Sequence, residues 1–329
     1  MKVDVRALLL RYRLVELAAG LCALGLVLRA RALLPAQHFS DGDYIAALNN
    51  GTTAIRPDPY YRSIAVFYAL LGLDDHPRVT AMLQLALFVA AIALALGPAA
   101  RWSTMALAAA AIGLGGVYLT QYSKDAVVLL FVLPILLVLR IDAWSAVAPY
   151  VTAGSLLVYG TLFRSTWLVI AALFVTGYVA LHRGGRPALL LPIAAAMFVI
   201  AGVGTFVLHH DTLDPVRAAN AMVEGVLTFA ALLLPIPLAM AGGWAHMLGA
   251  LVLTVFTVRM TAAARHSAGR PSLGVAVSLL LAFVVTQALA TPYFGAHLKH
   301  LTPMLPLAVF ALATADRAAR ERASVWHTL

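Results

Sequence analysis

Six short polar segments interrupt an otherwise apolar chain, and they carry most of the side chains that can do chemistry. Ionisable groups near a bilayer are costly to keep, and those found there are usually functional. Carboxylates, guanidinium groups, lysines and histidines recur in these segments. If these side chains all lie on one face of a membrane protein, we expect them to form a single polar site. The segments are Ser40–Tyr44, Arg56–Arg62, Gln121–Asp125, Phe163–Ser165, His209–Asp211 and His297–His300.

The basic side chains of these segments suit an anionic substrate. Arg56 and Arg62 flank a stretch that two prolines stiffen, and rigid guanidinium forks bind phosphate groups well. Lys124 opens a hydrophobic run, and Arg164 lies alone between two others. Cations on the outer side run against the positive-inside rule, so an anionic ligand is expected to compensate them. Lys299 adds a further cation near the end of the chain.

Structural explanations for the same segments stay open. The stretch 56–62 can be an interfacial anchor, with tyrosines at the headgroup level and arginines that snorkel toward water. In the functional interpretation, Asp58 and Tyr61 contact a sugar or a lipid headgroup. Arg164 can instead form a local salt bridge with Asp125 or Asp58.

Three residues are candidates for acid–base chemistry. A carboxylate beside cations stays ionised at neutral pH and can accept the proton of an attacking hydroxyl, which makes Asp43 and Asp125 candidate bases. Asp43 is the first choice, because the neighbouring Lys124 makes Asp125 a more natural structural partner. His300 is the alternate, since imidazole accepts protons near neutral pH.

The chemistry that these residues suggest requires no cofactor, although one divalent-metal site is conceivable. Asp41 and Asp43 flank a glycine, and two such carboxylates can converge on one hard cation. The alternative is an ordinary polar turn. The run His209–Asp211 has metal-ligand residue types, but sequential histidines seldom share one coordination geometry, so it is interpreted as a polar loop.

The elements that position these segments are those of a membrane protein. The chain has 329 residues, 62% of them hydrophobic and 11% charged, whereas soluble domains carry about 25% charged residues. No loop is long enough for an independent core, so a single transmembrane domain is expected over 1–329, without a separate soluble domain. The net charge of +9 is attributed to basic cytoplasmic loops rather than to nucleic-acid binding.

We expect an all-α polytopic protein with ten crossings and both termini in the cytoplasm. Residues 64–73 are too short to cross and are predicted to be re-entrant or interfacial, as is a broken helix within 222–243. Basic clusters at the N-terminus, 182–186, 259–270 and 317–322 fall on the cytoplasmic side. The predicted crossings are 14–34, 79–99, 103–120, 126–139, 143–163, 166–182, 187–208, 244–260, 273–292 and 301–316.

In order and topology the chain resembles the Wzy/EpsG-like polysaccharide polymerases of bacteria. The resemblance is carried by Ser40–Tyr44 after the first span, Asp58–Arg62 before the re-entrant stretch, Tyr122–Asp125 opening a span, Phe163-Arg164 between spans, and Lys299-His300 before the last span. The chain departs from many O-antigen polymerases in having no large outer loop.

The resemblance implies a glycosyltransferase of the bacterial cytoplasmic (inner) membrane. It would join oligosaccharide repeats linked to a polyprenyl diphosphate, such as undecaprenyl diphosphate, into an exopolysaccharide, capsule or O-antigen chain on the outer face. Flippase and chain-length-regulator partners and a GT-C-like fold are further implications. The expected catalytic residues are Asp43, Asp125 and His300, and the expected substrate-binding residues are Asp41, Arg56, Asp58, Tyr61, Arg62, Lys124, Arg164 and Lys299.

Two other classes fit the same topology. One is a GT-C transferase that uses a polyprenyl-phosphate sugar donor and places carboxylates in its first outer loop. The other is a non-enzymatic flippase or carrier for lipid-linked sugars, which should show internal repeats with paired broken helices. The sequence shows no such repeat, and the gathering of charges on one side favours an enzyme.

Overall fold

The computed structural model describes residues 5–33, 39–52, 59–97, 100–119, 125–184, 243–264, 270–290 and 294–326, with short pieces at 223, 226–227 and 230. These residues form helices and turns and contain no β-strand. Three helices are long and apolar enough to cross a membrane, namely Pro77–Leu96, Pro271–Leu289 and His297–Glu321. The expected all-α class is confirmed for these residues, with three helices that are long and apolar enough to span a membrane. The count of ten crossings stays a prediction.

The helices follow the hydrophobic runs closely. The first half contains α1 (Val5–Leu33), α2 (Ser40–Asn49), α3 (Pro59–Leu70), α4 (Pro77–Leu96), α5 (Trp102–Tyr118), the short 3-10 helix η2 (Ala126–Val128) and α6 (Leu129–Arg140). The rest contains η3 (Asp142–Trp144), α7 (Ala148–Leu162), α8 (Thr166–Gly184), α12 (Gly243–Ala264), α13 (Pro271–Ala290), α14 (Phe294–Leu301), η5 (Thr302–Met304) and α15 (Leu305–Trp326).

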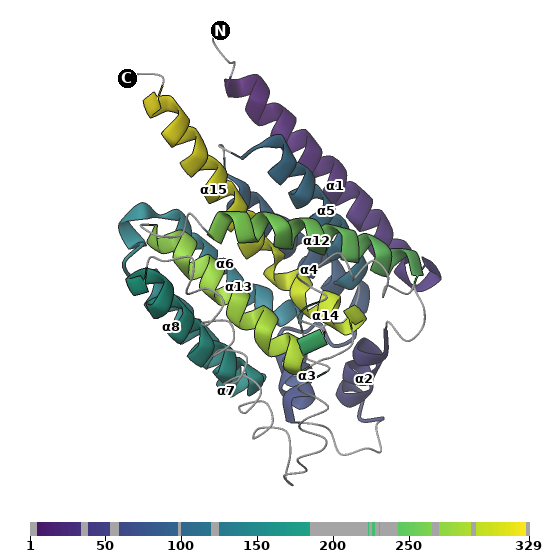
Figure 1. Ribbon diagram of the computed structural model, residues 1–329. Coiled ribbons are helices and arrows are strands. Elements are labelled where there is room, and N and C mark those ends of the chain that lie inside the picture. Colours follow the sequence, from purple (N-terminus) through teal and green to yellow (C-terminus); the bar gives the residue numbers. More distant parts are fainter. Residues whose placement is uncertain are drawn as a thin grey trace.

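The helix α13 and the segment His297–Glu321, which runs from α14 through η5 into α15, form the centre of the bundle, and 83% of the apolar window of each is buried. On one side of this centre α13 packs against the hairpin of α7 and α8, and on the other α15 packs against α4 and α5 (Figure 1). The long helix α1 lies at the periphery, along α5 and α4. The helices that carry the polar segments are therefore attached to a fully packed scaffold.

Small residues allow the peripheral helices to approach closely. At Gly116 of α5, an added Cβ would lie 2.8 Å from the Cα of Ala23 on α1. At the neighbouring Gly115, it would lie 2.6 Å from the ring of Phe88 on α4. Such contacts are typical of helices that pack in lipid, where dispersion between close backbones replaces the hydrophobic driving force.

Two elements differ from the sequence-based expectation. Ser40–Asn49 is a helix rather than a polar loop, and Phe294–Leu301 forms its own short helix before the last span. The last helix also continues to Trp326 rather than ending at 316. The predicted crossing at 187–208 lies outside the described residues, as does nearly all of the predicted broken helix at 222–243.

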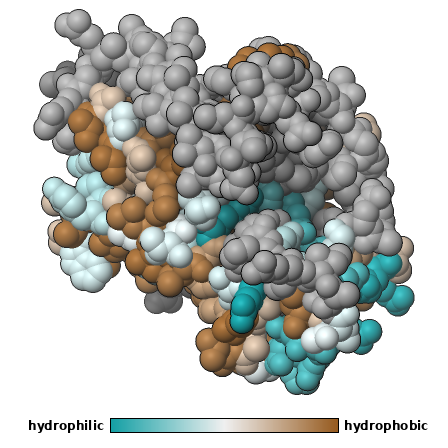
Figure 2. All heavy atoms as spheres, turned by 90° about the horizontal axis from the view of Figure 1, so that it is seen from below, coloured by the Kyte–Doolittle hydropathy of each residue, from teal (hydrophilic) through white to brown (hydrophobic). Residues whose placement is uncertain are grey.

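The polar helices α2, α3 and α14 lie toward one end of the molecule, and both chain ends lie at the other (Figure 1). Figure 2 shows the first of these ends from below, where hydrophilic atoms gather in a recess near the middle of the face. Apolar atoms lie along the left side of that recess in the same view. This end of the molecule is where the candidate site is found.

Candidate functional site

The short helix α14 carries Lys299 and His300 as neighbours, and each pairs with a carboxylate from a distant part of the chain. The Nζ of Lys299 donates to Oδ2 of Asp41 at 2.7 Å. The Nδ1 of His300 lies 2.6 Å from Oδ1 of Asp125. Adjacent side chains on a helix point about 100° apart, so one turn of α14 reaches both α2 and the start of η2. We define the α14 site as Asp41, Tyr61, Asp125, Arg164, Lys299 and His300.

Asp125 is the buried centre of this site. Its side chain is 5% exposed, and that of His300 is 7% exposed. The Nη1 of Arg164 lies 3.7 Å from the same Oδ1 that faces His300. A buried carboxylate is tolerated when it is paired and hydrogen-bonded, and Asp125 receives both kinds of support.

The geometry of Asp125 and His300 suits proton transfer. A hydrogen on Nδ1 would be donated to Asp125, and the imidazole Nε2 would then keep its lone pair. A carboxylate in this position orients the ring and stabilises the imidazolium that forms when Nε2 accepts a proton. The pair can therefore act as a general base of the Asp–His type.

The second half of the site combines charge with aromatic surface. The hydroxyl of Tyr61 on α3 donates to Oδ1 of Asp41 at 2.6 Å, so Asp41 is bound by both Tyr61 and Lys299. The ring of Tyr61 also meets that of Tyr44 edge-on, with centroids 5.1 Å apart. Aromatic faces beside hydrogen-bonding groups are well suited to sugar rings, which present C–H surface and hydroxyl groups together.

Aromatic side chains hold Arg164 in place. Arg164 lies in a turn whose backbone N–H donates to the carbonyl of Tyr159 at 3.2 Å. The rings of Tyr159 and Phe163 stack with centroids 5.3 Å apart. Phe67 from α3 meets Phe163 edge-on at 5.8 Å, and Trp167 meets Tyr159 at 4.6 Å. Packing thus fixes the turn that carries Arg164, and Asp125 lies beside its guanidinium.

Asp43 lies apart from the buried groups. Its side chain is 54% exposed and forms a salt bridge with Arg31 of α1. Asp41 and Asp43 are two residues apart on a helix, so their side chains point about 200° from each other. Each carboxylate has its own cationic partner, and this arrangement does not favour a shared metal. Within the described residues, no group of three or more His, Cys, Asp or Glu side chains is placed to hold a metal ion.

The structure brings together six of the residues that the sequence singled out. These six form the α14 site. Arg62 lies exposed on α3. Asp43 lies on α2 and forms its salt bridge with Arg31 of α1. Arg56, Asp58, Lys124 and the run His209–Asp211 fall outside the described residues. The local salt bridge of Arg164 with Asp125, one of the alternatives left open by the sequence, is present.

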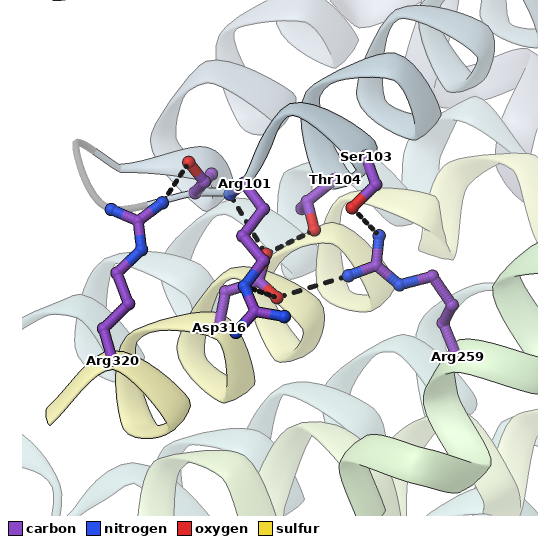
Figure 3. Close-up of polar contacts among 7 residues, drawn as sticks. Arg101, Ser103, Thr104, Arg259, Asp316 and Arg320 are labelled. Carbon is purple, nitrogen blue, oxygen red and sulfur yellow. Dashed lines mark hydrogen bonds and ion pairs between the residues drawn. The ribbon is translucent and has the colours of Figure 1, made fainter. Parts of the chain in front are cut away.

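A second polar cluster, which the sequence analysis did not single out, surrounds Asp316 on α15 (Figure 3). Its Oδ2 accepts the hydroxyl of Thr104 at 2.6 Å and the backbone N–H of Arg101 at 3.1 Å. Its Oδ1 accepts from Arg259 of α12 at 3.2 Å, and Arg259 also reaches Ser103 at 2.8 Å. A carboxylate directly before the basic run 317–322 was the available signal.

The Asp316 cluster links helices and has the character of a structural clamp. Asp316 is 5% exposed, and every contact described above is made to α5, α12 or the residue that precedes α5. Arg320, one turn later on α15, donates to the carbonyl of Ala100 at 3.1 Å. The described partners of Asp316 all belong to the helical scaffold, so we assign the Asp316 cluster a role in stability.

Comparison of the chain with protein-family models, with curated proteins and with solved structures finds no match. The α14 site joins the first, middle and last parts of the chain, and it combines a proton acceptor, two cations and an aromatic wall.

Proposed function

We propose that this protein is a membrane glycosyltransferase of the Wzy/EpsG-like polymerase class. It joins polyprenyl-diphosphate-linked oligosaccharide repeats at the end of the molecule where α2, α3 and α14 lie. The observation that carries the proposal is the contact of His300 with Asp125, beside the contact of Lys299 with Asp41. One short helix thereby aligns a base with a cation, which is what displacement of a diphosphate by a hydroxyl requires.

The chemical step uses these groups in defined roles. The acceptor hydroxyl gives its proton to Nε2 of His300, and its oxygen forms a bond to the anomeric carbon of the donor. The bond from that carbon to the diphosphate oxygen breaks, and the electron pair leaves with the polyprenyl diphosphate. Asp125 stabilises the imidazolium, and general-base assistance of this kind contributes about 10²–10⁴-fold.

The cations of the site support the leaving group. Lys299 carries three N–H donors, and one of them is directed to Asp41, so an ammonium can bind a phosphate oxygen while keeping its carboxylate partner. Arg164 provides a planar guanidinium, which matches phosphate oxygens in a bidentate manner. A diphosphate leaves without a separate general acid, so the same site needs no second proton donor.

The proposal includes the placement of the site outside the bacterial inner membrane, with ten crossings and both termini in the cytoplasm. Both chain ends lie opposite the α14 site (Figure 1), which supports this orientation. The basic residues Arg317 and Arg320 belong to the same end as the C-terminus, as the positive-inside rule requires of a cytoplasmic face.

The test is elongation by purified protein in lipid nanodiscs. We expect the wild type to lengthen a polyprenyl-diphosphate-linked repeat without any nucleotide sugar. His300→Asn keeps a side-chain N–H that can donate to Asp125 but removes Nε2, so it should bind the donor and lose about 10²–10⁴-fold in rate. His76→Asn, at an exposed histidine between α3 and α4, is the matched control and should remain active.

Three results would contradict the proposal. The first is elongation that depends on a nucleotide sugar. The second is movement of the repeat across the bilayer with no new glycosidic bond, which would identify a flippase. The third is a rate for His300→Asn equal to that of His76→Asn, which would remove His300 from the mechanism.

A further inference from the structure

We infer that His297 and Gln287 form an inner polar subsite that binds hydroxyl groups of the acceptor sugar next to His300. This inference rests on the proposed glycosyl transfer and adds a specificity-determining pair to it. Gln287 lies near the end of α13 and His297 near the start of α14. Neither residue belongs to the α14 site as defined above.

Both side chains are completely buried, and neither makes a hydrogen bond of ordinary geometry. The polar contact that His297 does have is with the backbone of Gln287. Each residue is 0% exposed. Neither ring nitrogen of His297 and neither amide atom of Gln287 makes a hydrogen bond within the described part of the chain. Among the buried side chains of that part, these are the two in which both polar atoms are unpaired. Buried polar groups are nearly always satisfied, so such a pair requires an explanation.

Poor packing of the region does not explain the pair. Thr286, which precedes Gln287, is also 0% exposed, and its hydroxyl donates to the carbonyl of Ala282 at 2.8 Å. Leu298, which follows His297, packs tightly on Gly249 of α12, where an added Cβ would lie 2.9 Å from Leu298 Cδ1. The helices are therefore well packed on either side of two polar groups that make no ordinary hydrogen bond.

The pair lies beside the proposed base. His297 and His300 are three residues apart on α14, so their side chains share one face of the helix. His297 is close enough to His300 for their charges to interact, and it lies beside the backbone of Gln287. A polar group held by His297 and Gln287 would therefore sit next to the group that accepts the proton.

The chemistry of the pair selects a polyhydroxyl ligand. A neutral imidazole offers one donor and one acceptor, and the amide of Gln287 offers two donors and a carbonyl acceptor. Neighbouring hydroxyls of a sugar ring each donate and accept, so they can satisfy such a set. Neither side chain is a fixed cation, which makes a phosphate a poor match, and an apolar group would leave all four atoms unpaired.

The test separates a ligand-binding role from a structural one. Gln287→Met and His297→Leu remove polar atoms that make no ordinary hydrogen bond within the described part of the protein, so the melting temperature in detergent should stay the same or rise. The KM for the acceptor repeat should increase about tenfold in each single variant, which is the usual effect of one lost hydrogen bond to a ligand. The KM for the donor should stay near the wild-type value.

A control variant exists on the same helix. Ser278 of α13 is also fully buried, and its hydroxyl makes no hydrogen bond among the described residues. It lies two and a half helical turns from Gln287, at roughly 13 Å. Ser278→Ala should therefore match the stability effect of Gln287→Met and leave the KM for the acceptor unchanged.

Each result decides the inference. An unchanged acceptor KM in a stable Gln287→Met or His297→Leu protein would overturn it and leave the proposed transferase intact. Loss of the folded state in both variants would show that the pair is structural and would also overturn it. If the wild type forms no glycosidic bond at all, the proposed function itself fails, and the subsite falls with it.

Discussion

At the residue scale, the arrangement around Asp125 explains why a buried charge is kept in an apolar bundle. One carboxylate oxygen faces both an imidazole at 2.6 Å and a guanidinium at 3.7 Å. An isolated carboxylate at this depth would be neutralised or would destabilise the fold. Its two partners stabilise the charged form of the carboxylate, and the charged form is the one that can orient His300 and stabilise its protonated state.

The first prediction concerns Arg164. Arg164→Ala removes a charged partner of Asp125, so we expect a loss of roughly 3 kcal/mol in unfolding free energy, as for a broken buried pair, and a fall in elongation rate of at least about tenfold. Arg164→Lys should regain much of the stability but little of the activity, because an ammonium cannot reproduce the guanidinium fork. Thermal unfolding and elongation assays measure the two effects separately.

Arg78→Lys serves as the control for Arg164, because Arg78 lies exposed at the start of α4. It should behave like the wild type in both assays. Normal abundance together with full activity of Arg164→Ala would contradict the role assigned to Arg164.

The sequence identified the residues of the site better than the contacts between them. Residue type and position in an apolar chain were sufficient to select Asp41, Asp125 and Arg164 as candidates. The contact of His300 with Asp125 joins residues 175 positions apart, and no local pattern carries that information. The preference for Asp43 over Asp125 rested on the neighbouring Lys124, whereas the described partners of Asp125 come from α14 and from the turn after α7.

At the element scale, the short helix α14 determines whether the site is assembled. Leu298 packs this helix on Gly249 of α12. Its two neighbours are polar: His297 lies beside the backbone of Gln287, and Lys299 contacts Asp41. Any larger residue at 249 requires the Leu298 side chain to shift, because an added Cβ would lie 2.9 Å from its Cδ1. The position of α12 is therefore coupled to the position of Lys299 and His300.

The second prediction tests that coupling. Gly249→Val should push α14 away from its partners and lower the elongation rate at least about tenfold, although no polar residue has changed, since displacements of about 1 Å can cost 10²-fold. The double variant Gly249→Val/Leu298→Ala restores space for the valine and should recover a large part of the activity. Elongation rates of the two variants, measured with their melting temperatures, provide the comparison.

A double variant no more active than Gly249→Val would argue against the coupling of α12 to α14. The control is Gly20→Val on α1, where an added Cβ meets no atom within 4 Å. This variant should keep wild-type activity.

The third prediction concerns the clamp that joins α5, α12 and α15. Asp316→Asn removes the charge that Arg101 and Arg259 share, and we expect a loss of roughly 2 kcal/mol in unfolding free energy, because hydrogen bonds to charged groups contribute about 1.5–3 kcal/mol and the arginines are partly hydrated. The elongation rate of the remaining folded protein should be unchanged, since the clamp belongs to the scaffold. Chemical denaturation and elongation assays measure these effects.

Combining Asp316→Asn with Arg259→Gln gives a double-mutant cycle. The two single losses in stability should add to more than the loss of the double variant. Simple additivity would show that the contact between Asp316 and Arg259 contributes nothing measurable.

Hydrophobicity predicted the long helices and missed the short polar ones. The predicted crossings at 79–99, 103–120, 166–182 and 273–292 agree with α4, α5, α8 and α13 within a few residues. The helices α2 and α14 contain charged residues and lack an apolar run of membrane length, so hydrophobicity alone does not predict them. They are held by tertiary contacts, such as Lys299 with Asp41, that a single sequence does not reveal.

At the scale of the whole molecule, two polar clusters bound an apolar middle. His300 and Asp316 are separated by about 24 Å of nearly continuous helix, at about 1.5 Å per residue. That length is close to the hydrocarbon thickness of a bilayer, about 30 Å. The α14 site and the Asp316 cluster therefore fit the two boundaries of one membrane, and the composition alone was sufficient to predict a membrane protein but not this spacing.

The last prediction is that the α14 site faces outward and the Asp316 cluster faces the cytoplasm. Single cysteines are introduced on a Cys22→Ala background, which removes the one native thiol. Asp75→Cys lies in the exposed turn between α3 and α4, at the end that holds the site. Ala143→Cys lies in the exposed turn after α6, whose Arg140 packs against Gly97 at the other end of α4.

An impermeant thiol reagent applied to intact cells should label Asp75→Cys and leave Ala143→Cys unlabelled until the membrane is permeabilised. The expectation follows from α4, which is 20 residues long and apolar enough to cross a membrane, so the turns at its two ends must open to different compartments. Labelling of both positions in intact cells would show that α4 does not cross. Labelling of Ala143→Cys alone would invert the orientation and place the α14 site in the cytoplasm, where a polymerase that acts on exported repeats could not reach its substrate.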